Sequence, residues 1–547
     1  MRSYVLPIFG FLLFLLTYIS CANPITPSGG PKDELPPVLD TLKSFENYQT
    51  RFEKSDIELY FDEFINVRNP VTQIVISPPL TFGRQVNHRG KKVKIEFAPE
   101  ETLKENATYV INFGDAIVDF TEGNVLSNFT LVFSTGDFID SLSLEGQVKD
   151  AFTSESLADI LVMLYVDNRD SVVYQNRPYY FAKSDEEGKF KINNLRADTF
   201  KLFALRDQNL NYLFDLASEE IGFLADSIIL TDTSQFNLEI EIFKEESDPR
   251  YNSFDLITRG QIQLNFDGVP EDTLIHILDS CTYYLVKEES NSYLDLWFTP
   301  RNLSRLRFVT PDNQNSLDTV SIRIRNVEEP LNFLDPPRLL IEGAEAHHPE
   351  KPLEIEFNRP ISEIDTSLMT IMDTSNQRNI TYGLTRSDNP LRLILEADWP
   401  NERNIQFNLL PGFATDLFGY THDTLDLNMS IGSPLDYGSI EISLVNKDSS
   451  TNYFIELVLG EKVIDTRNVY ASEDKVTFEK LIPETFQLRV TEDLNANSKW
   501  DPGNYLLKRQ SENVYLLDLE KLKDNWILSK EIDLSALKSG GNDTQDQ

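Results

Sequence analysis

The chain has 547 residues, 40% of them hydrophobic and 11% aromatic, so it can fold into roughly three to five domains, each with its own core. Its 50 Lys and Arg residues are outnumbered by 88 Asp and Glu residues. The net charge of −38 argues against nucleic-acid binding, because an acidic surface repels phosphate backbones. With only two cysteines, Cys21 and Cys281, neither a disulfide framework nor a four-thiolate zinc site can form.

The first twenty residues predict a signal peptide. Arg2 precedes an apolar run over residues 5–19, which is too short to span a bilayer core of about 30 Å as a helix. Ser20 then stands directly before Cys21, an arrangement that resembles a bacterial lipoprotein signal, with Tyr18 where the usual pattern has leucine. We therefore predict cleavage before Cys21 and its lipidation, which would anchor the protein in a membrane. The alternative is an ordinary signal peptide followed by a chance cysteine.

Residues 21–35 are rich in Pro, Gly and Ser and predict a flexible tether. From residue 36 onward, apolar and polar residues alternate in short segments, among them 57–61, 93–97, 129–133, 238–242 and 440–444. A period of two predicts antiparallel strands with one buried face. Because turn residues separate these short strands, β-sandwiches are favoured over a parallel α/β sheet.

Internal repeats indicate how the strands are grouped. Eight residues recur 286 positions later in the same register: Leu195, Thr199, Phe200, Leu202, Asp207, Asn209, Asn211 and Asp215 reappear as Leu481, Thr485, Phe486, Leu488, Asp493, Asn495, Asn497 and Asp501. Such a match indicates two copies of one module. A weaker match relates the Pro-Pro pair at 36–37 and residues 57–61 to a second Pro-Pro pair at 336–337 and residues 353–357.

We therefore predict an all-β protein, an elongated tandem array of sandwiches behind the signal peptide and tether. The modules are named A (36–139), B (140–247), C (248–333), A′ (334–433) and B′ (434–538), and a polar tail covers 539–547. Each module has about the size of one Ig-like sandwich.

Several short motifs carry a family resemblance. They are Cys21-Ala22-Asn23-Pro24, residues 29–33, the Pro-Pro pair at 36–37, Phe61-Asp62-Glu63 and residues 133–136. As a set over residues 21–137, they resemble Bacteroidetes-type envelope lipoproteins that begin with a bacterial Ig-like domain of the S-layer kind. Residues 144–150, at the start of module B, resemble a transthyretin-like or carboxypeptidase-regulatory sandwich. The resemblance implies Ig-like folds for A and A′, transthyretin-like folds for B and B′, and support or binding rather than catalysis.

The repeated Asp-x-Asn-x-Asn-x3-Asp segments are candidate calcium sites, because calcium takes six to eight oxygen ligands and alternate loop positions can converge on one point. The candidate ligands are Asp207, Asn209, Asn211 and Asp215 in B, with Glu219 or Glu220 completing the shell, and Asp493, Asn495, Asn497 and Asp501 in B′. Tyr212 and Ser498 stand where such loops usually have glycine, and Ser218 and Asn504 where they have glutamate. The alternative is a turn that Asp and Asn side chains close by bonding the backbone.

Other candidate sites carry weaker signals. Acid pairs such as Asp62-Glu63, or Asp115 with Asp119, could imitate glycosidase carboxylates, but chance neighbours are expected among 88 acids. The pair His347-His348 predicts an exposed loop and has no third metal ligand nearby in the sequence.

These features predict a non-enzymatic, lipid-anchored envelope protein that acts as an interaction or scaffold component, a subunit of an outer-membrane complex for assembly or export. Its expected partners are the membrane, through lipidated Cys21, and another envelope or outer-membrane protein, and not nucleic acid. The sequence leaves open whether it faces the periplasm or the cell surface. One alternative is a glycan- or peptidoglycan-binding lipoprotein using aromatics such as residues 179–181, Trp297 and Trp500, although most such aromatics belong to cores. A third reading is an accessory subunit of an envelope hydrolase.

Overall fold

A computed structural model of the chain describes residues 33–246, 249–268, 275–287, 292–299, 302–311, 317–325, 328–341, 346–448, 450–470 and 472–538. The predicted signal peptide, Cys21, most of the tether and the polar tail lie outside the described residues.

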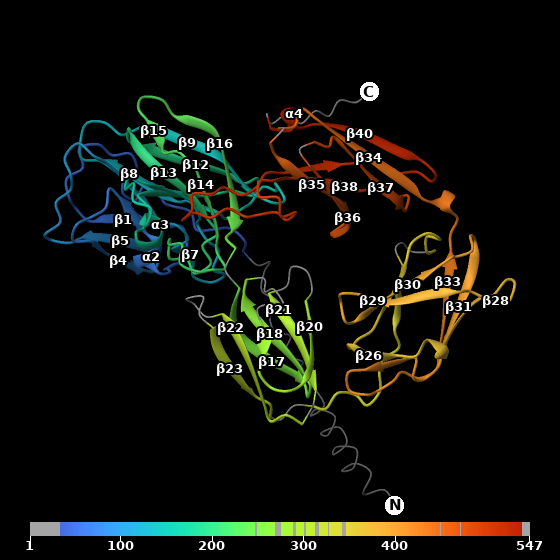
Figure 1. Ribbon diagram of the computed structural model, residues 1–547. Coiled ribbons are helices and arrows are strands. Elements are labelled where there is room, and N and C mark those ends of the chain that lie inside the picture. Colours follow the sequence, from blue (N-terminus) through green and yellow to red (C-terminus); the bar gives the residue numbers. More distant parts are fainter. Residues whose placement is uncertain are drawn as a thin grey trace, which may run out of the picture. The chain divides into compact units, whose positions relative to one another are not determined.

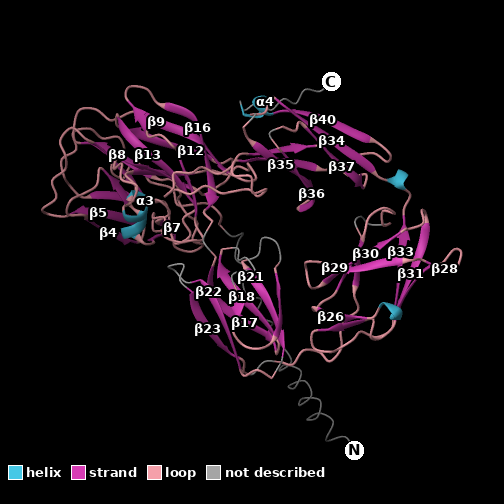
Figure 2. Cartoon of the chain, in the orientation of Figure 1, coloured by secondary structure: helices cyan, strands magenta, loops and turns pink. Residues whose placement is uncertain are grey.

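The described part of the chain consists mainly of strands and the turns between them (Figures 1 and 2), which confirms the all-β prediction. Its helices are short: α2 (Pro70–Gln73), α3 (Val172–Gln175), α4 (Leu534–Lys538) and the 3₁₀ turns η2 (Thr366–Leu368) and η3 (Pro434–Asp436). Within the described ranges, no helix has the length and apolar character needed to cross a membrane.

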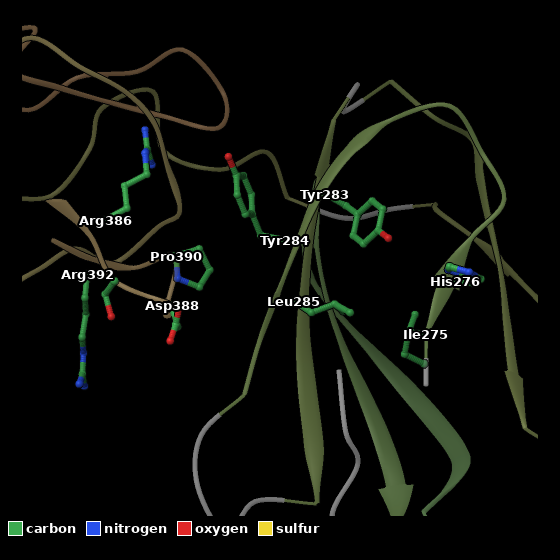
Figure 3. A pocket seen from close by; sticks show the side chains of 10 residues that line it. Ile275, His276, Tyr283, Tyr284, Leu285, Arg386, Asp388, Pro390 and Arg392 are labelled. Carbon is green, nitrogen blue, oxygen red and sulfur yellow. The ribbon is translucent and has the colours of Figure 1, made fainter. Parts of the chain in front are cut away.

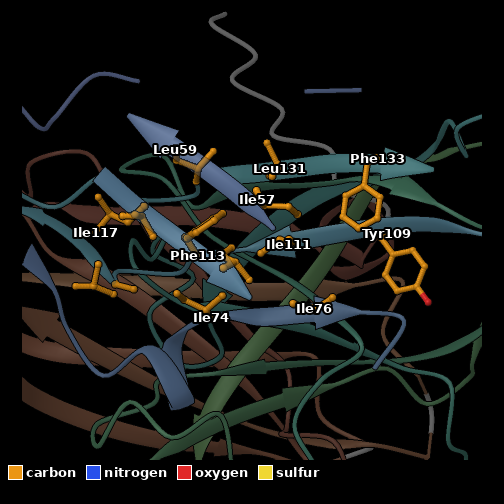
Figure 4. Close-up of a cluster of buried hydrophobic side chains, with 14 of the residues drawn as sticks. Ile57, Leu59, Ile74, Ile76, Tyr109, Ile111, Phe113, Ile117, Leu131 and Phe133 are labelled. Carbon is orange, nitrogen blue, oxygen red and sulfur yellow. The ribbon is translucent and has the colours of Figure 1, made fainter. Parts of the chain in front are cut away.

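Module A forms two small sheets and a strand pair. One sheet has the order β1 (Ile57–Tyr60), β5 (Lys92–Phe97), β4 (Arg84–Arg89), and the other β3 (Val75–Ser77), β6 (Thr108–Asn112), β8 (Thr130–Ser134), while β2 (Ile65–Val67) pairs with β7 (Ile117–Asp119). Ile57 and Leu59 pair with Ile95 and Val93, so the apolar positions of both strands share one buried face. Figure 4 shows Ile57 and Leu59 beside Ile111, Phe133 and their neighbours in the core.

Module A′ repeats this pairing. Its sheets have the orders β24 (Arg338–Leu340), β25 (Leu353–Glu356), β30 (Arg392–Ala397), β29 (Tyr382–Arg386) and β28 (Arg378–Asn379), β27 (Met369–Asp373), β31 (Arg403–Leu409), β33 (Leu425–Ile431). The pair of β26 (Ile361–Ile364) with β32 (Ala414–Asp416) corresponds to β2 with β7. A′ therefore has the topology of A with one additional edge strand on each sheet.

Module B is one eight-stranded sheet. Its order is β11 (Tyr180–Lys183), β10 (Leu161–Tyr165), β13 (Asp198–Leu205), β14 (Glu220–Phe223), β16 (Gln235–Lys244), β9 (Leu142–Asp150), β12 (Lys189–Leu195), with β15 (Ile228–Leu230) paired to β13. Most neighbours are antiparallel, but β16 runs parallel to β9. The last strand of the module thus returns beside the first.

Module B′ repeats these pairings in two sheets. They have the orders β37 (Lys475–Leu481), β34 (Gly438–Val445), β40 (Ile527–Asp533) and β36 (Lys462–Val469), β35 (Asn452–Leu459), β38 (Gln487–Asp493), β39 (Val514–Asp518). The first and last strands, β34 and β40, are again parallel. Strand β34 has an alternating pattern of buried and half-buried residues along its whole length, as its period-two sequence predicts.

Module C has two sheets around its own core. The orders are β17 (Arg250–Thr258), β18 (Gln261–Asp267), β21 (Tyr293–Thr299), β20 (Thr282–Val286) and β19 (His276–Ile277), β22 (Arg305–Pro311), β23 (Leu317–Arg323). Each hydrogen-bonded sheet of the described chain takes its strands from a single predicted module. Tertiary contacts divide the chain into two compact units, Met1–Ser143 with Asn193–Arg196, and the remainder.

Candidate functional site

The candidate site with the clearest sequence signature is the pair of Asp–Asn loops. In B the loop joins β13 to β14, and in B′ the corresponding loop joins β38 to β39. Both loops thus connect equivalent strands of the two repeats, and the predicted ligands occupy equivalent places.

In module B the predicted ligands gather around Asp215. Its two carboxylate oxygens accept the side-chain amides of Asn209 at 3.0 Å and Asn211 at 2.8 Å. The carboxylate of Asp207 accepts the backbone N–H groups of Asn211 at 3.2 Å and Tyr212 at 2.8 Å. Tyr212 has a left-handed φ of 65°, so the position that is usually glycine keeps the glycine-like backbone with a different side chain.

Module B′ repeats this network. Asp501 accepts the side-chain amides of Asn495 at 2.7 Å and Asn497 at 2.9 Å. Asp493 accepts the backbone N–H groups of Asn497 at 3.0 Å and Ser498 at 2.9 Å. Ser498 has a left-handed φ of 59°. The repeated sequence therefore encodes one turn geometry, formed twice.

A buried glutamate closes each loop from its far end. Glu219, 1% exposed, accepts the backbone N–H groups of Gln208, Asp215 and Leu216. Glu512, 4% exposed, accepts those of Leu494 and Asp501. Burial raises the pKa of both carboxyls. Each glutamate therefore holds the backbone of its loop.

The sequence comparison did not identify the second of these glutamates. The loop pattern predicts Glu219 only as a further calcium ligand, and Glu512 lies 293 positions after it instead of 286. A seven-residue insertion shifts it out of the repeat register. Allowing a gap in the comparison of the two loops would have found it.

The loop of module B is hydrogen-bonded internally in a way that needs no ion. Both oxygens of Asp215 and both oxygens of Asp207 already accept N–H groups. Among the described residues, no group of three or more His, Cys, Asp or Glu side chains is placed to hold a metal ion. The arrangement fits a turn closed by Asp and Asn side chains, and calcium binding stays a prediction.

We expect Asp215→Ala to destabilise module B by about 1 kcal/mol, because two amide groups lose their shared acceptor. Hydrogen exchange of β13 and β14 measures this loss in module B, with Leu216→Ala in the same loop as the control. We expect millimolar calcium to leave the wild-type melting temperature unchanged. A calcium-dependent rise that disappears when Asp215 and Asp501 are both replaced by Ala would establish the metal site instead.

Asp115 and Asp119 of module A also serve the fold. Asp119 accepts the backbone N–H groups of Glu122, Gly123 and Asn124 at 2.6–2.9 Å. Although burial acts to raise the pKa of Asp119, these N–H groups hold it below its usual value. Asp115 accepts the hydroxyl of Ser127 at 3.2 Å. These contacts assign both carboxylates a role in turns.

The prediction that His347 and His348 lie on an exposed loop is wrong. The two side chains are only 4% and 5% exposed. His347 Nε2 lies 2.9 Å from the Lys351 carbonyl oxygen, and His348 Nδ1 accepts the Glu350 N–H. The His348 ring packs 4.4 Å from that of Tyr437, and burial lowers the pKa of His348 to about 4. Packing against the start of B′ covers a segment that looks like a surface loop in the sequence.

The candidate sugar-stacking aromatics lie mainly in cores. Tyr180, Phe181 and Trp297 are 4–6% exposed. Trp500 donates its indole N–H to the Glu512 carbonyl oxygen at 3.0 Å, and its ring lies 4.9 Å from that of Phe152. None of these four side chains forms an open platform for a sugar ring.

A pocket of about 550 Å³ lies between modules C and A′. Figure 3 shows Tyr284 of β20 on the side that faces Pro390 and Arg386. Arg386 donates to the backbone carbonyl of Ser362 at 2.8 Å, and Arg392 pairs with Glu354 and Glu356. Both guanidinium groups in the lining therefore already hold parts of A′ together.

One family model matches the N-terminal part of the chain. A family model described as a bacterial Ig-like domain matches residues 33–135, which confirms the Ig-like prediction for module A. No match was found among curated proteins.

The chain is also similar to several solved structures, among them the following three. The Bacillus anthracis TIE protein is 10% identical, with 93% of this chain and 76% of that one covered and a TM-score of 0.15. The S-layer protein rSbsC(31-844) is 10% identical, with 87% and 67% covered and a TM-score of 0.18. BcpA, the major pilin subunit of Bacillus cereus, is 9% identical, with 72% and 99% covered and a TM-score of 0.13.

Proposed function

We propose that this protein is a lipid-anchored, non-catalytic scaffold of the bacterial cell envelope and a subunit of an outer-membrane protein complex for assembly or export. The observation that carries the proposal is the repeated A–B pair, in which two strand topologies each occur twice. Repetition of closed sandwiches suits a spacer or a multi-point binder, because each added module supplies another surface on one chain.

The N-terminal region supports an envelope location. A bacterial Ig-like domain begins twelve residues after Cys21, the residue that resembles a lipidated cysteine. Twelve residues keep the start of this domain within roughly 40 Å of the anchor even when fully extended. Module A would therefore work close to the membrane that holds the lipid.

Modules B and B′ support the same reading. In both, the last strand lies parallel to the first, and the sequence at the start of B resembles transthyretin-like sandwiches. We assign these modules to that class of accessory sandwich. The Asp and Asn side chains of their loops form hydrogen bonds that close turns. This structural role favours support or binding over catalysis.

We expect Cys21→Ala to leave the sandwiches folded while releasing the protein from the membrane fraction, because acyl chains can no longer be attached. Fractionation after a high-salt wash measures this, and circular dichroism of the released protein checks the fold. Cys281→Ala is the matched control and should remain membrane-bound. If the Cys21→Ala protein stays in the washed membranes, the anchor proposal fails.

The complex itself is tested by purifying the native protein in mild detergent and measuring the stoichiometry of whatever accompanies it. A membrane protein present at a ratio near one to one would support a dedicated subunit. Recovery of the protein alone would contradict that role.

Glycan binding is the second candidate function, and one observation favours it. Phe64 and Phe120 of module A are 62% and 73% exposed, and the Phe120 N–H donates to the Phe64 carbonyl oxygen at 2.9 Å. Two neighbouring exposed rings could stack on sugars. Sedimentation with purified peptidoglycan tests this, and binding that Phe64→Ala and Phe120→Ala abolish would support it.

A further inference from the structure

The two repeats differ most where their Asp–Asn loops end. In B three residues separate Asp215 from the buried Glu219, whereas in B′ ten residues, 502–511, separate Asp501 from Glu512. Each glutamate nevertheless accepts the backbone N–H of the aspartate at the start of this interval. The seven extra residues of B′ therefore leave the closure of its own loop intact and need another explanation.

The extra residues form a small hairpin. The backbones of Asn504 and Arg509 exchange hydrogen bonds of 2.7 and 3.0 Å. Arg509 also donates from its guanidinium to the Pro502 carbonyl oxygen at 3.1 Å. The segment thus has a defined shape of its own, which lowers the entropy lost when it docks.

Tyr505, near the start of this hairpin, is buried against module B. It is 2% exposed, and its ring lies 5.0 Å from Phe203, 5.1 Å from Phe223 and 6.0 Å from Tyr174. All three rings belong to B. The two leucines that follow, Leu506 and Leu507, are about 70% exposed. Of these three neighbouring residues, only Tyr505 is buried.

Polar contacts surround the buried ring. The Tyr505 backbone N–H donates to the Glu245 carboxylate, and the Gln510 side-chain amide donates to the Phe223 carbonyl oxygen at 2.9 Å. Lys508 pairs with Asp170 at 2.8 Å. An apolar centre with a polar rim is the anatomy of a specific protein interface.

Gly503 shows how closely the hairpin approaches B. A Cβ atom at this position would lie 2.2 Å from the Phe243 ring, well inside van der Waals contact. Near the hairpin, Trp500 packs against Phe152, and the Arg489 guanidinium lies 4.3 Å from the centre of the same ring. Residues that precede the insertion therefore add to the same contact surface.

We propose that residues 502–511 are an intramolecular strap that locks module B′ onto the aromatic surface of module B formed by Tyr174, Phe203, Phe223 and Phe243. B and B′ are not neighbours in the chain, since C and A′ lie between them. By holding both ends of the C–A′ segment, the strap fixes the spacing at which C and A′ present their surfaces. The inference goes beyond the proposed function and holds with or without a lipid anchor.

The first test replaces residues 502–511 with Leu-Ala-Ser, the sequence between Asp215 and Glu219. This chimera gives B′ the short loop of B and keeps Glu512. The second variant is Gly503→Val, which forces a side chain against Phe243. Its matched control is Gly383→Val, because a Cβ atom at Gly383 meets nothing within 4 Å and neither glycine has a left-handed φ.

The readout is the distance between two spin labels in the full chain. The labels are attached at the exposed positions Asp232→Cys in B and Lys530→Cys in B′. The two native cysteines are removed by Cys21→Ser and Cys281→Ser so that no other site is labelled. We expect one narrow distance distribution for the otherwise unchanged protein and for Gly383→Val. The chimera and Gly503→Val should both give broad distributions. A narrow, unchanged distribution in folded chimera and Gly503→Val proteins would overturn the proposal.

A peptide covering residues 499–512 provides a second measurement, which is independent of the distances between spin labels. It should bind the chimera, whose aromatic surface is uncovered, at least tenfold more tightly than the same peptide with Tyr505→Ser. Equal binding of the two peptides would overturn the proposed role of the tyrosine.

Protein that carries a single spin label distinguishes a contact within one chain from a contact between two copies of the chain. A label-to-label signal that grows with concentration would overturn the intramolecular assignment.

Discussion

Replacing Asp416 with Asn should destabilise module A′ by about 3–5 kcal/mol, because it leaves the charge of Arg359 buried without its partner. Asp416 is fully buried and Arg359 is 6% exposed, and their side chains meet at 2.9 Å. Arg359 also donates to the carbonyl oxygens of Leu331 and Phe333. Its guanidinium thereby holds the segment before A′ against the module.

The measurement must report on A′ alone, since a multidomain chain does not unfold in one two-state step. Hydrogen exchange of β26 and β32 provides that resolution. Glu354→Gln is the control, because its pair with Arg392 lies in the same module, is about 40% exposed and is worth less than about 1 kcal/mol. Equal, small effects of the two substitutions would contradict a structural role for the buried pair. Adding Arg359→Met to Asp416→Asn should recover part of the loss, because no unpaired charge then remains.

Phe133→Ala should destabilise module A by a similar amount, about 3–5 kcal/mol, through the cavity it leaves in the core. The Phe133 side chain is fully buried and stacks on Tyr109 with ring centres 5.2 Å apart. Its ring also lies 4.4 Å from Phe52 and 6.1 Å from Phe45. One truncation therefore removes contacts to three other aromatic rings, of which Figure 4 labels Tyr109.

Hydrogen exchange of β6 and β8 measures this loss, with Phe120→Ala as the control on an exposed ring of the same module. We expect the control to change stability by less than about 0.5 kcal/mol. Protection in B′ should stay unchanged in both variants, because B′ has a core of its own. A loss of protection that spread equally through B′ would contradict independent cores.

The strands could be predicted because the signal is local. In β34, Ile440, Ile442 and Leu444 are buried and the residues between them are not, as period-two alternation requires. The Asp–Asn turn was equally visible, because its residues hydrogen-bond within nine positions of one another and recur in fixed register.

Prediction failed where a residue's surroundings come from distant parts of the chain. The sequence near His347 and His348 looks like a polar loop, yet Tyr437 covers His348 from 89 positions away. Glu63 and Arg359 follow equivalent strands of A and A′, but only Arg359 forms a buried ion pair. No local pattern distinguishes these two outcomes.

The sequence by itself determined the all-β architecture, the duplicated modules and the positions of the two Asp–Asn segments, because alternation and repeat register are visible in the order of the residues alone. Only the tertiary structure decided that the histidine pair is buried and that Tyr505 packs against module B. Each of these depends on burial by residues distant in sequence. The exposed fraction of a residue depends on the folded chain around it, so it cannot be predicted from the composition of the residue's own segment.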